Sequence, residues 1–155
     1  MKGMSQSSHA GDSHNLNRFV EAQKVDYEQA LAEVKSGRKQ SHWMWYVFPQ
    51  FDGLGSTSTS QKYSIKSVAE AKAYLSHPTL GSRLIAIATA ALGVEGRSAY
   101  KIFESPDDMK LKSCATLFAH VSPDGSVFEQ ILDKFFQGDR DLKTLSLLGV
   151  ADKGK

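Results

Sequence analysis

The sequence predicts an all-α, single-domain bundle of about six to seven short helices with one long Gly/Ser loop. Apolar residues recur at helical spacing through most of residues 16–149, and residues that start or stop helices flank most of these stretches. The only run with strand character, Trp43–Phe48, is too short to be assigned by periodicity. A chain of 155 residues lies in the usual range for one domain.

The two ends of the chain are predicted to lie outside the helical domain. Residues 1–15 are rich in Ser, His, Gly and Asn and lack periodic apolar positions, which predicts a disordered tail. Residues 150–155 are expected to fray for the same reason. The helical domain is therefore placed at residues 16–149.

Two helices are predicted in the first forty residues. The first, Leu16–Gln23, is short. The second starts at Asp26, which is a good N-cap and is followed three residues later by Gln29. Gly37 is expected to end it, because glycine adopts the left-handed conformation of a helix C-terminus without strain.

Two more helices are predicted between residues 67 and 92. Ser67 and Glu70 form a capping-box pattern, which predicts a helix through Leu75 that Pro78 ends. The following segment, Thr79–Leu92, is apolar enough to lie centrally in the bundle.

The last fifty residues predict three helices. Ser105 followed by Pro106 and two acids is a typical helix start, with Ser as the cap and Pro at the first helical position. The clearest amphipathic stripe is Val127–Phe136, which Gly138 stops. A final short helix is expected at 142–148, ended by a glycine.

Composition and charge exclude several classes of protein. The chain has 19 basic and 17 acidic residues, a formal charge of +2 that is too even to predict a nucleic-acid surface. One cysteine, Cys114, cannot form an internal disulfide and favours a reducing compartment. No apolar run approaches the roughly 20 residues that span a bilayer, and no secretory signal is seen. We expect a cytoplasmic protein with no nucleic-acid partner, no membrane association and no cofactor; its oligomeric state is not indicated.

One segment, Ser41–Gly55, stands out because it contains both tryptophans and five aromatic residues in all. Aromatic walls, an amide and a Gly/Ser loop are common parts of small-molecule pockets. Trp43 and Trp45 could sandwich a planar ring whose edge Gln50 reads. The backbone N–H groups of 53–56 could cradle an anion, although no Walker or dinucleotide glycine pattern is present.

The simpler interpretation of these aromatic residues is that they belong to the core, which is the commoner use of Trp and Phe. The stretch that follows, Pro49–Gln61, favours function instead. It has 13 residues without helical or strand periodicity. Connections of that length are more often functional or disordered than ordinary turns.

The segment also resembles a known family. The run Ser41–Gln50, followed by Gly53-Leu54-Gly55 and by Ser60, Tyr63 and Ile65, is similar to the hallmark of the domain-of-unknown-function family DUF1810, often labelled calpastatin-like. The similarity covers about residues 16–149. It implies an all-helical, cytosolic domain with no established activity. The calpastatin label is not supported, because a calpain inhibitor of that kind is long, repetitive and disordered. Glu104 is a departure, because the resemblance implies Gly at this position, and the turn before Ser105 is expected to differ.

Small-molecule binding is the function that this pattern favours. We expect the protein to bind or process a small, polar, planar, nucleotide-like ligand, with Arg83 or Lys110 meeting a negative group. The alternative is a protein-interaction module in which the aromatic segment docks a partner. Burial distinguishes the two. The candidate ligand-binding residues are His42, Trp43, Trp45, Gln50, Gly53, Gly55, Ser60, Tyr63, Arg83, Lys110 and Ser113.

Other reactive residue types have simpler interpretations. His77 precedes Pro78 at a helix end and is expected to cap it. Acids in a first turn, such as Asp107, stabilise the helix dipole. Cys114 lies on an apolar helix face and is expected to be inert core. No His/Glu pair or Cys/His cluster has metal-ligand spacing, so no metal site and no catalytic residue are assigned.

Overall fold

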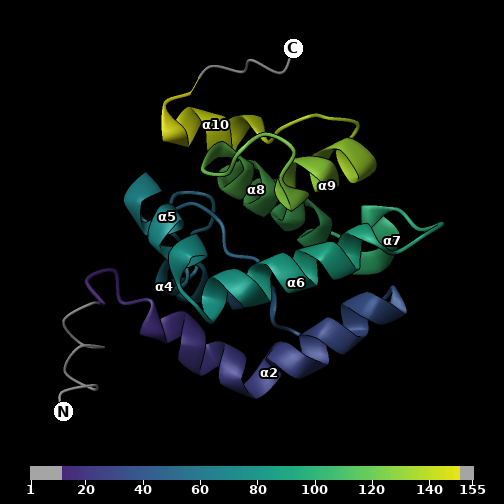
Figure 1. Cartoon of the computed structure of the whole chain (residues 1–155), viewed down its shortest axis with the longest axis horizontal. Coiled ribbons are helices and arrows are strands. Elements are labelled where there is room, and N and C mark those ends of the chain that lie inside the picture. The colour runs from purple at the N-terminus through teal and green to yellow at the C-terminus, as the bar shows by residue number, and fades with distance from the viewer. Residues whose placement is uncertain (1–11, 151–155) are drawn as a thin grey trace.

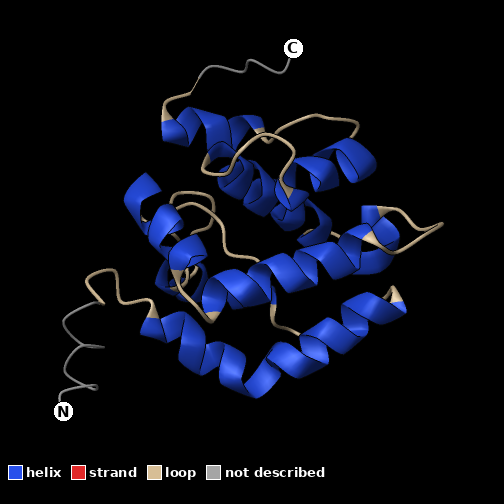
Figure 2. Ribbon diagram, in the orientation of Figure 1, coloured by secondary structure: helices blue, strands red, loops and turns tan. Residues whose placement is uncertain are grey.

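The described part of the chain, residues 12–150, is helical in the computed structural model (Figures 1 and 2). Six helices have seven residues or more, and three are single short turns. The all-α prediction is therefore confirmed. The bounds are α2 (Asn17–Ser36), α3 (Met44–Val47), α4 (Ser58–Lys62), α5 (Val68–Ser76), α6 (Leu80–Leu92), α7 (Ala99–Phe103), α8 (Asp107–His120), α9 (Val127–Phe136) and α10 (Leu142–Leu148).

The predicted N-terminal tail and frayed C-terminus lie mostly outside the described residues, which leave out 1–11 and 151–155. Residues 12–15, also assigned to the tail, form a turn before α2. The carboxylate of Asp12 accepts hydrogen bonds from the backbone N–H groups of Leu16 and Asn17. None of the described helices is both long and apolar enough to cross a membrane.

Helix α6 lies at the centre of the bundle, as its apolar sequence predicts. It packs against α2 on one side, against α9 on the other and against α5 near its N-terminus (Figure 1). The crossing with α5 is so close that a Cβ atom added to Gly81 would lie 2.1 Å from the carbonyl oxygen of Leu75. Only glycine therefore fits at this position without moving one of the two helices.

Helix α2 is one continuous helix where the sequence pattern predicts two. Asp26, the expected cap of the second helix, instead accepts a hydrogen bond from the hydroxyl of Tyr46. With its side chain used in that contact and no Gly or Pro nearby, the helix continues through this point. Gly37 ends it in the left-handed conformation, φ +84°, as predicted.

The segment Trp43–Phe48 is not a strand, because its centre forms the short helix α3. The expected loop Pro49–Gln61 also contains the start of a helix. Thr57 caps α4 by accepting a hydrogen bond from the backbone N–H of Ser60. Before α4, residues 49–57 run without regular structure apart from one isolated bridge to Ile65.

Helix caps follow the sequence prediction in most places. The Ser67 hydroxyl accepts from the N–H of Glu70 at 3.0 Å, which confirms the predicted start of α5. His77 follows the last residue of α5, and it also caps the next helix. Its Nδ1 accepts from the N–H groups of Thr79, just before α6, and of Leu80, the first residue of α6, both at 3.1 Å. Ser105 is not a cap. Helix α8 begins after Pro106, and no side chain caps its N-terminus.

Glu104, the residue that departs from the family resemblance, joins α7 to α8 in an unusual conformation. Its φ is +62° and its ψ is 165°. This region of backbone space is almost restricted to glycine, because a Cβ atom clashes with the neighbouring peptide. The turn is therefore shaped for the glycine that the resemblance implies, and Glu104 occupies it under strain.

Candidate functional site

The two tryptophans of the aromatic segment have different surroundings. Trp43 is buried, with 1% of its surface exposed, and its indole N–H donates to Glu33 at 2.9 Å. Its ring packs against Phe48, with centroids 6.3 Å apart. Trp43 is therefore a core residue, and the expected sandwich of a ligand between Trp43 and Trp45 does not form.

Glu33 on α2 fixes the chain that leads to Trp43. Its carboxylate accepts five hydrogen bonds: from the side chains of Gln29, Ser41 and Trp43, and from the backbone N–H groups of Gln40 and Ser41. Burial alone would raise the pKa of Glu33. The hydrogen bonds outweigh burial because they favour the charged form, and together they lower the pKa to about 2.

Trp45 lies within α3 and is only partly buried. The ammonium of Lys110 lies 3.7 Å from the centroid of its ring, in a cation–π contact. Lys110 also pairs with one carboxylate oxygen of Asp107 at 3.1 Å. The other carboxylate oxygen is 2.8 Å from the ammonium of Lys39. The exposed fractions of these side chains are 18% for Lys110 and Asp107 and 7% for Lys39.

An open pocket of about 230 Å³ lies beside this cluster. It is bounded by the aromatic segment and loop, by the first turns of α8 and by the start of α10. Five of the predicted ligand-binding residues are among those that line it. The lining residues are Trp45, Gln50, Leu54, Gly55, Pro106, Met109, Lys110, Ser113, Asp141 and Lys143.

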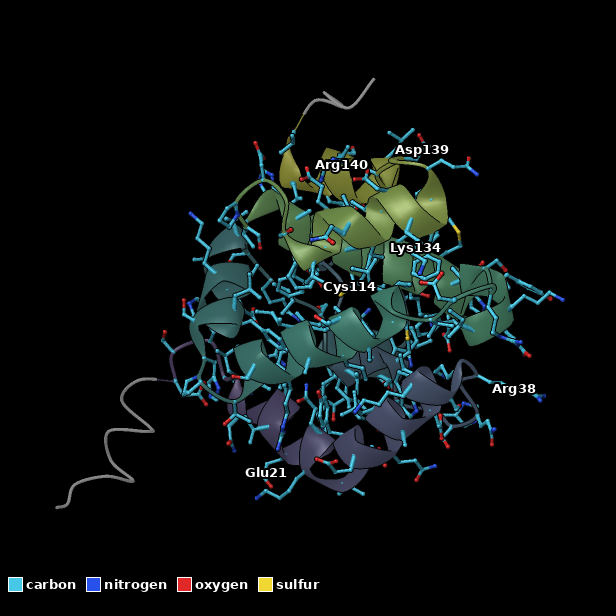
Figure 3. The ribbon with its side chains drawn as sticks, turned by 45° about the vertical axis from the view of Figure 1, so that its right-hand side comes forward. Glu21, Arg38, Cys114, Lys134, Asp139 and Arg140 are labelled. Atoms are coloured by element: carbon cyan, nitrogen blue, oxygen red, sulfur yellow. The ribbon has the colours of Figure 1, made fainter. Side chains whose placement is uncertain are left out.

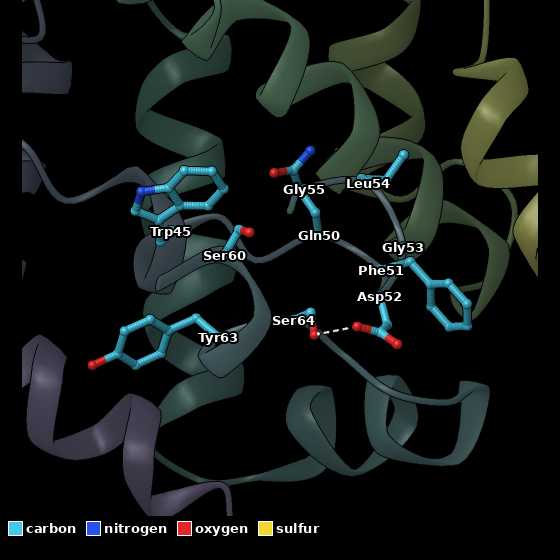
Figure 4. Close-up of a pocket in the computed structure, with 10 residues that line it drawn as sticks. All are labelled: Trp45, Gln50, Phe51, Asp52, Gly53, Leu54, Gly55, Ser60, Tyr63 and Ser64. Atoms are coloured by element: carbon cyan, nitrogen blue, oxygen red, sulfur yellow. Dashed lines mark hydrogen bonds between the residues drawn. The ribbon is translucent and has the colours of Figure 1, made fainter. Parts of the chain in front are cut away.

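A second, much smaller cavity lies within the loop itself (Figure 4). Its volume is about 10 Å³, close to the least that can hold one water molecule. Three further predicted ligand-binding residues line this cavity. Ser64 and Asp52 line it too, and the Ser64 hydroxyl donates to the Asp52 carboxylate at 2.8 Å. Those predicted residues are Gly53, Ser60 and Tyr63. They shape the loop and do not line the open pocket.

Two glycines give the loop its shape. Gly53 has φ +103°, which other residues adopt only with strain. A Cβ atom on Gly55 would lie 2.6 Å from the side chain of Ser60 on α4, so a larger residue would clash there unless the loop or α4 moved. In Figure 4 the Gln50 side chain points away from Tyr63. Gln50 lines both the small cavity and the open pocket.

His42 and Arg83, the other two predicted residues, are not among those that line the open pocket. His42 is exposed on the surface. The guanidinium of Arg83 on α6 is 3.4 Å from the side-chain oxygen of Gln23 and stacks 5.3 Å from the Tyr27 ring centroid. Arg83 therefore stabilises the contact of α6 with α2.

Sequence reasoning missed several residues of this region. Asp141 and Lys143 come from the last helix, and Lys39 from the residues after α2. Asp107 was assigned to the helix dipole, whereas it bridges two lysines. The only available signal was the family resemblance, which covers these segments within residues 16–149. Spacing along the chain does not show that these segments meet.

The open pocket combines apolar surface with a few polar side chains. Trp45, Leu54, Pro106 and Met109 supply apolar surface. The Gln50 amide makes no hydrogen bond with another residue of the described chain, so its donors and acceptor are available. The hydroxyl of Ser113 donates to the carbonyl of Met109 in its own helix at 3.1 Å.

The described residues around the pocket include neither a reactive thiol nor a metal site. Cys114 lies inside the domain on α8 (Figure 3), and burial raises the pKa of its thiol well above the ordinary value. Within residues 12–150, no group of three His, Cys, Asp or Glu side chains could hold a metal ion.

Comparisons with known proteins agree with the resemblance noted in the sequence. Residues 13–148 match the family described as "Protein of unknown function (DUF1810)". The structure is similar to the crystal structure of the conserved hypothetical protein Rv1873 from Mycobacterium tuberculosis. The TM-score is 0.88 and the identity 44%, over 90% of this chain and 100% of that one. No curated protein matches the sequence. The chain therefore belongs to the DUF1810 family of proteins of unknown function.

Proposed function

We propose that the open pocket between the aromatic segment and α8 binds a small, planar, polar ligand. The observation that carries this proposal is the convergence of Trp45, Gln50 and Gly55 with Lys110 and Ser113 in a single hollow. These residues come from segments about sixty positions apart in the sequence. A pocket with apolar walls and a few polar groups is the usual architecture of a small-molecule site.

The volume limits the size of this ligand. At about 230 Å³ the pocket is larger than the roughly 150 Å³ cavity that holds benzene, and smaller than most drug-sized sites. It suits one ring system, such as a nucleobase or a substituted aromatic ring. Any larger portion of the ligand, such as a sugar phosphate, would extend into solvent over the start of α10.

The polar groups suit the edge of such a ring. Trp45, one face of which Lys110 covers, supplies aromatic surface, and Met109 and Leu54 add the apolar contact that Trp43 does not. The unpartnered Gln50 amide can both donate and accept, which is what reading the edge of a base requires. The Ser113 hydroxyl already donates to the Met109 carbonyl, which supports a binding role over a nucleophilic one. A cytoplasmic location, inferred from the single cysteine, is part of the same proposal.

The alternative, a docking patch made by the aromatic segment, needs these side chains at the surface. Trp43, Met44, Val47 and Phe48 are instead buried, each with 3% or less of its surface exposed. The large apolar side chains that are exposed in the described chain come from other segments: Val25, Ile85, Tyr100, Met109, Leu142 and Leu147. Burial therefore supports the pocket over the patch.

A ligand screen by thermal unfolding tests the proposal. The panel should contain nucleobases, nucleosides, nucleotides and aromatic acids, each measured with the wild type and with Trp45→Ala. Tyr100→Ala is the matched control, because Tyr100 is 56% exposed and does not line the pocket. A ligand at one hundred times its Kd should stabilise the wild type and the control by about 2.7 kcal/mol. If no compound stabilises the wild type more than it stabilises Trp45→Ala, the proposal fails.

A further inference from the structure

Positive charges outnumber negative charges around the open pocket. Lys110 and Lys143 line it together with Asp141. Behind them, Lys39 and Lys110 share the single carboxylate of Asp107. Three lysines therefore face two carboxylates, and one positive charge has no carboxylate partner in this cluster.

The carboxylate of Asp107 mainly neutralises the charge of Lys39, the more buried of its two lysine partners. Lys39 is only 7% exposed, and an unpaired ammonium at that depth would be costly. Its ammonium is also held by the carbonyl of Ser41 and lies 4.9 Å from the Trp43 ring centroid, so it cannot leave Asp107 easily. The charge of Asp107 is therefore largely used by Lys39, which leaves Lys110 incompletely neutralised at the edge of the pocket.

The second carboxylate is also occupied. One oxygen of Asp141 accepts hydrogen bonds from the backbone N–H and the hydroxyl of Thr144, at 3.0 and 2.6 Å, where it caps α10. Lys143, by contrast, makes no hydrogen bond or ion pair with another residue in the described range. Two lysines on the pocket wall are thus available to an anion, one of them fixed in place against Trp45.

We infer that Lys110 and Lys143 bind an anionic group of the ligand, a carboxylate or a phosphate, and that Lys39 is a positioning residue that keeps Asp107 from neutralising Lys110. This inference rests on the proposed function of the pocket and names the chemical class of its ligand. The ring of the ligand contacts Trp45 and Gln50, and its acidic group lies towards the starts of α8 and α10.

Benzoate and benzamide form a matched pair of probes, because they share a planar ring and differ in charge. Binding is followed by NMR chemical shifts of the backbone and of the tryptophan indole N–H groups. The wild type should bind benzoate more tightly than benzamide. Lys110→Gln should weaken benzoate about tenfold, the loss expected for one charge-assisted hydrogen bond, and should leave benzamide nearly unchanged. Lys143→Gln should have a smaller effect in the same direction.

The control is Lys24→Gln, since Lys24 is 66% exposed on α2 and pairs only with a surface glutamate. It should leave the affinity for both probes unchanged. Asp107→Asn is the more informative variant. It frees both Lys39 and Lys110 from their carboxylate, so its affinity for benzoate should rise several-fold. If this variant is less stable than the wild type, inorganic phosphate should restore its stability more than chloride does at the same ionic strength.

The outcomes separate this inference from the proposed function. If benzamide shifts the Trp45 resonances and benzoate binds no more tightly, the pocket binds rings and the anion site is refuted. If inorganic phosphate shifts the residues around Lys110 and Lys143 while neither ring compound binds, the anion site stands and the planar ligand is refuted. An unchanged benzoate affinity in Lys110→Gln and Asp107→Asn would overturn the inference directly.

Discussion

Trp43 and Trp45 are two positions apart in the sequence and belong to two different regions of the molecule. Trp43 lies in the core, hydrogen-bonded to Glu33 and packed on Phe48. Trp45 lies at the rim of an open pocket with the ammonium of Lys110 on its face. The local backbone differs as well: Trp43 precedes the short helix α3 with a non-helical backbone, φ −143° and ψ 6°, whereas Trp45 lies within the helix.

The comparison shows that one short segment can supply both the core and the candidate site. The Trp43 side anchors the segment to α2 through a carboxylate that is fully used by hydrogen bonds. The Trp45 side keeps polar groups, such as the Gln50 amide, without partners in the described structure. Substitutions on the two sides should therefore separate loss of stability from loss of binding.

The largest effect is expected for Trp43→Ala. It removes a fully buried ring and leaves Glu33 without one of its donors, so the free energy of unfolding should fall by about 3–5 kcal/mol. Trp45→Ala should cost only about 1 kcal/mol, because that ring is partly exposed. Urea unfolding followed by far-UV circular dichroism measures both. Equal losses of stability in the two variants would contradict the assignment of Trp43 to the core and Trp45 to the rim of the pocket.

The next effect is the pH dependence that Glu33 contributes on the Trp43 side. Its pKa is about 2 in the folded protein and 4.5 ordinarily. A lowered pKa stabilises the fold above pH 4.5, and this stabilisation is lost as the pH falls towards 2. At neutral pH it should be worth about 1–2 kcal/mol after allowing for solvent screening.

The control is Glu33→Gln, which cannot ionise. The difference in unfolding free energy between the wild type and this variant should be constant from pH 7 to 5 and should shrink below pH 4.5. A difference that does not change down to pH 2 would show that the charge of Glu33 contributes nothing.

Glu104→Gly acts at the joint between the two regions. Phe103 before it packs against Phe48 in the core, with ring centroids 5.8 Å apart, and Pro106 after it lines the pocket. Glycine relieves a conformation with φ +62°, although it also makes the unfolded chain more flexible. The net gain should be about 1 kcal/mol, with no change in ligand affinity. A lower melting temperature for Glu104→Gly would contradict the strain assigned to this turn.

The smallest effect on stability is expected for Lys110→Gln, on the Trp45 side. It removes a cation–π contact and one ion pair of a partly exposed lysine, which together should be worth about 0.5–1 kcal/mol. Asp107 keeps its pair with Lys39. A loss above about 2 kcal/mol, measured by the same urea unfolding, would mean that Lys110 is mainly structural.

The fold was predictable from sequence wherever a single residue decides a helix end. Gly37 ends α2 and Ser67 caps α5, both as expected. The continuation of α2 past Asp26 was not predictable. Asp26 is a good N-cap by residue type, but its carboxylate instead accepts a hydrogen bond from Tyr46 of another helix. That contact exists only in the folded chain.

The candidate site was predictable in part for a similar reason. Trp45 and Gln50 belong to a segment whose composition is unusual, so composition alone singled them out. Trp43 has the same composition signal and is core, because its tertiary contacts with Glu33 and Phe48, which composition does not show, bury it. Lys39 and Lys143 carry no local signal, because lone lysines are common on any protein surface and only tertiary structure brings them to the pocket.

The most direct test of this account uses the indole N–H groups, because the chain has two tryptophans and hence two indole resonances. The indole of Trp43 should exchange its proton slowly and keep its chemical shift when ligands are added. The indole of Trp45 should exchange faster and should shift with the compounds that raise the melting temperature. If both indoles are equally protected and no compound moves the Trp45 resonance, the aromatic segment is core on both sides and the pocket has no ligand.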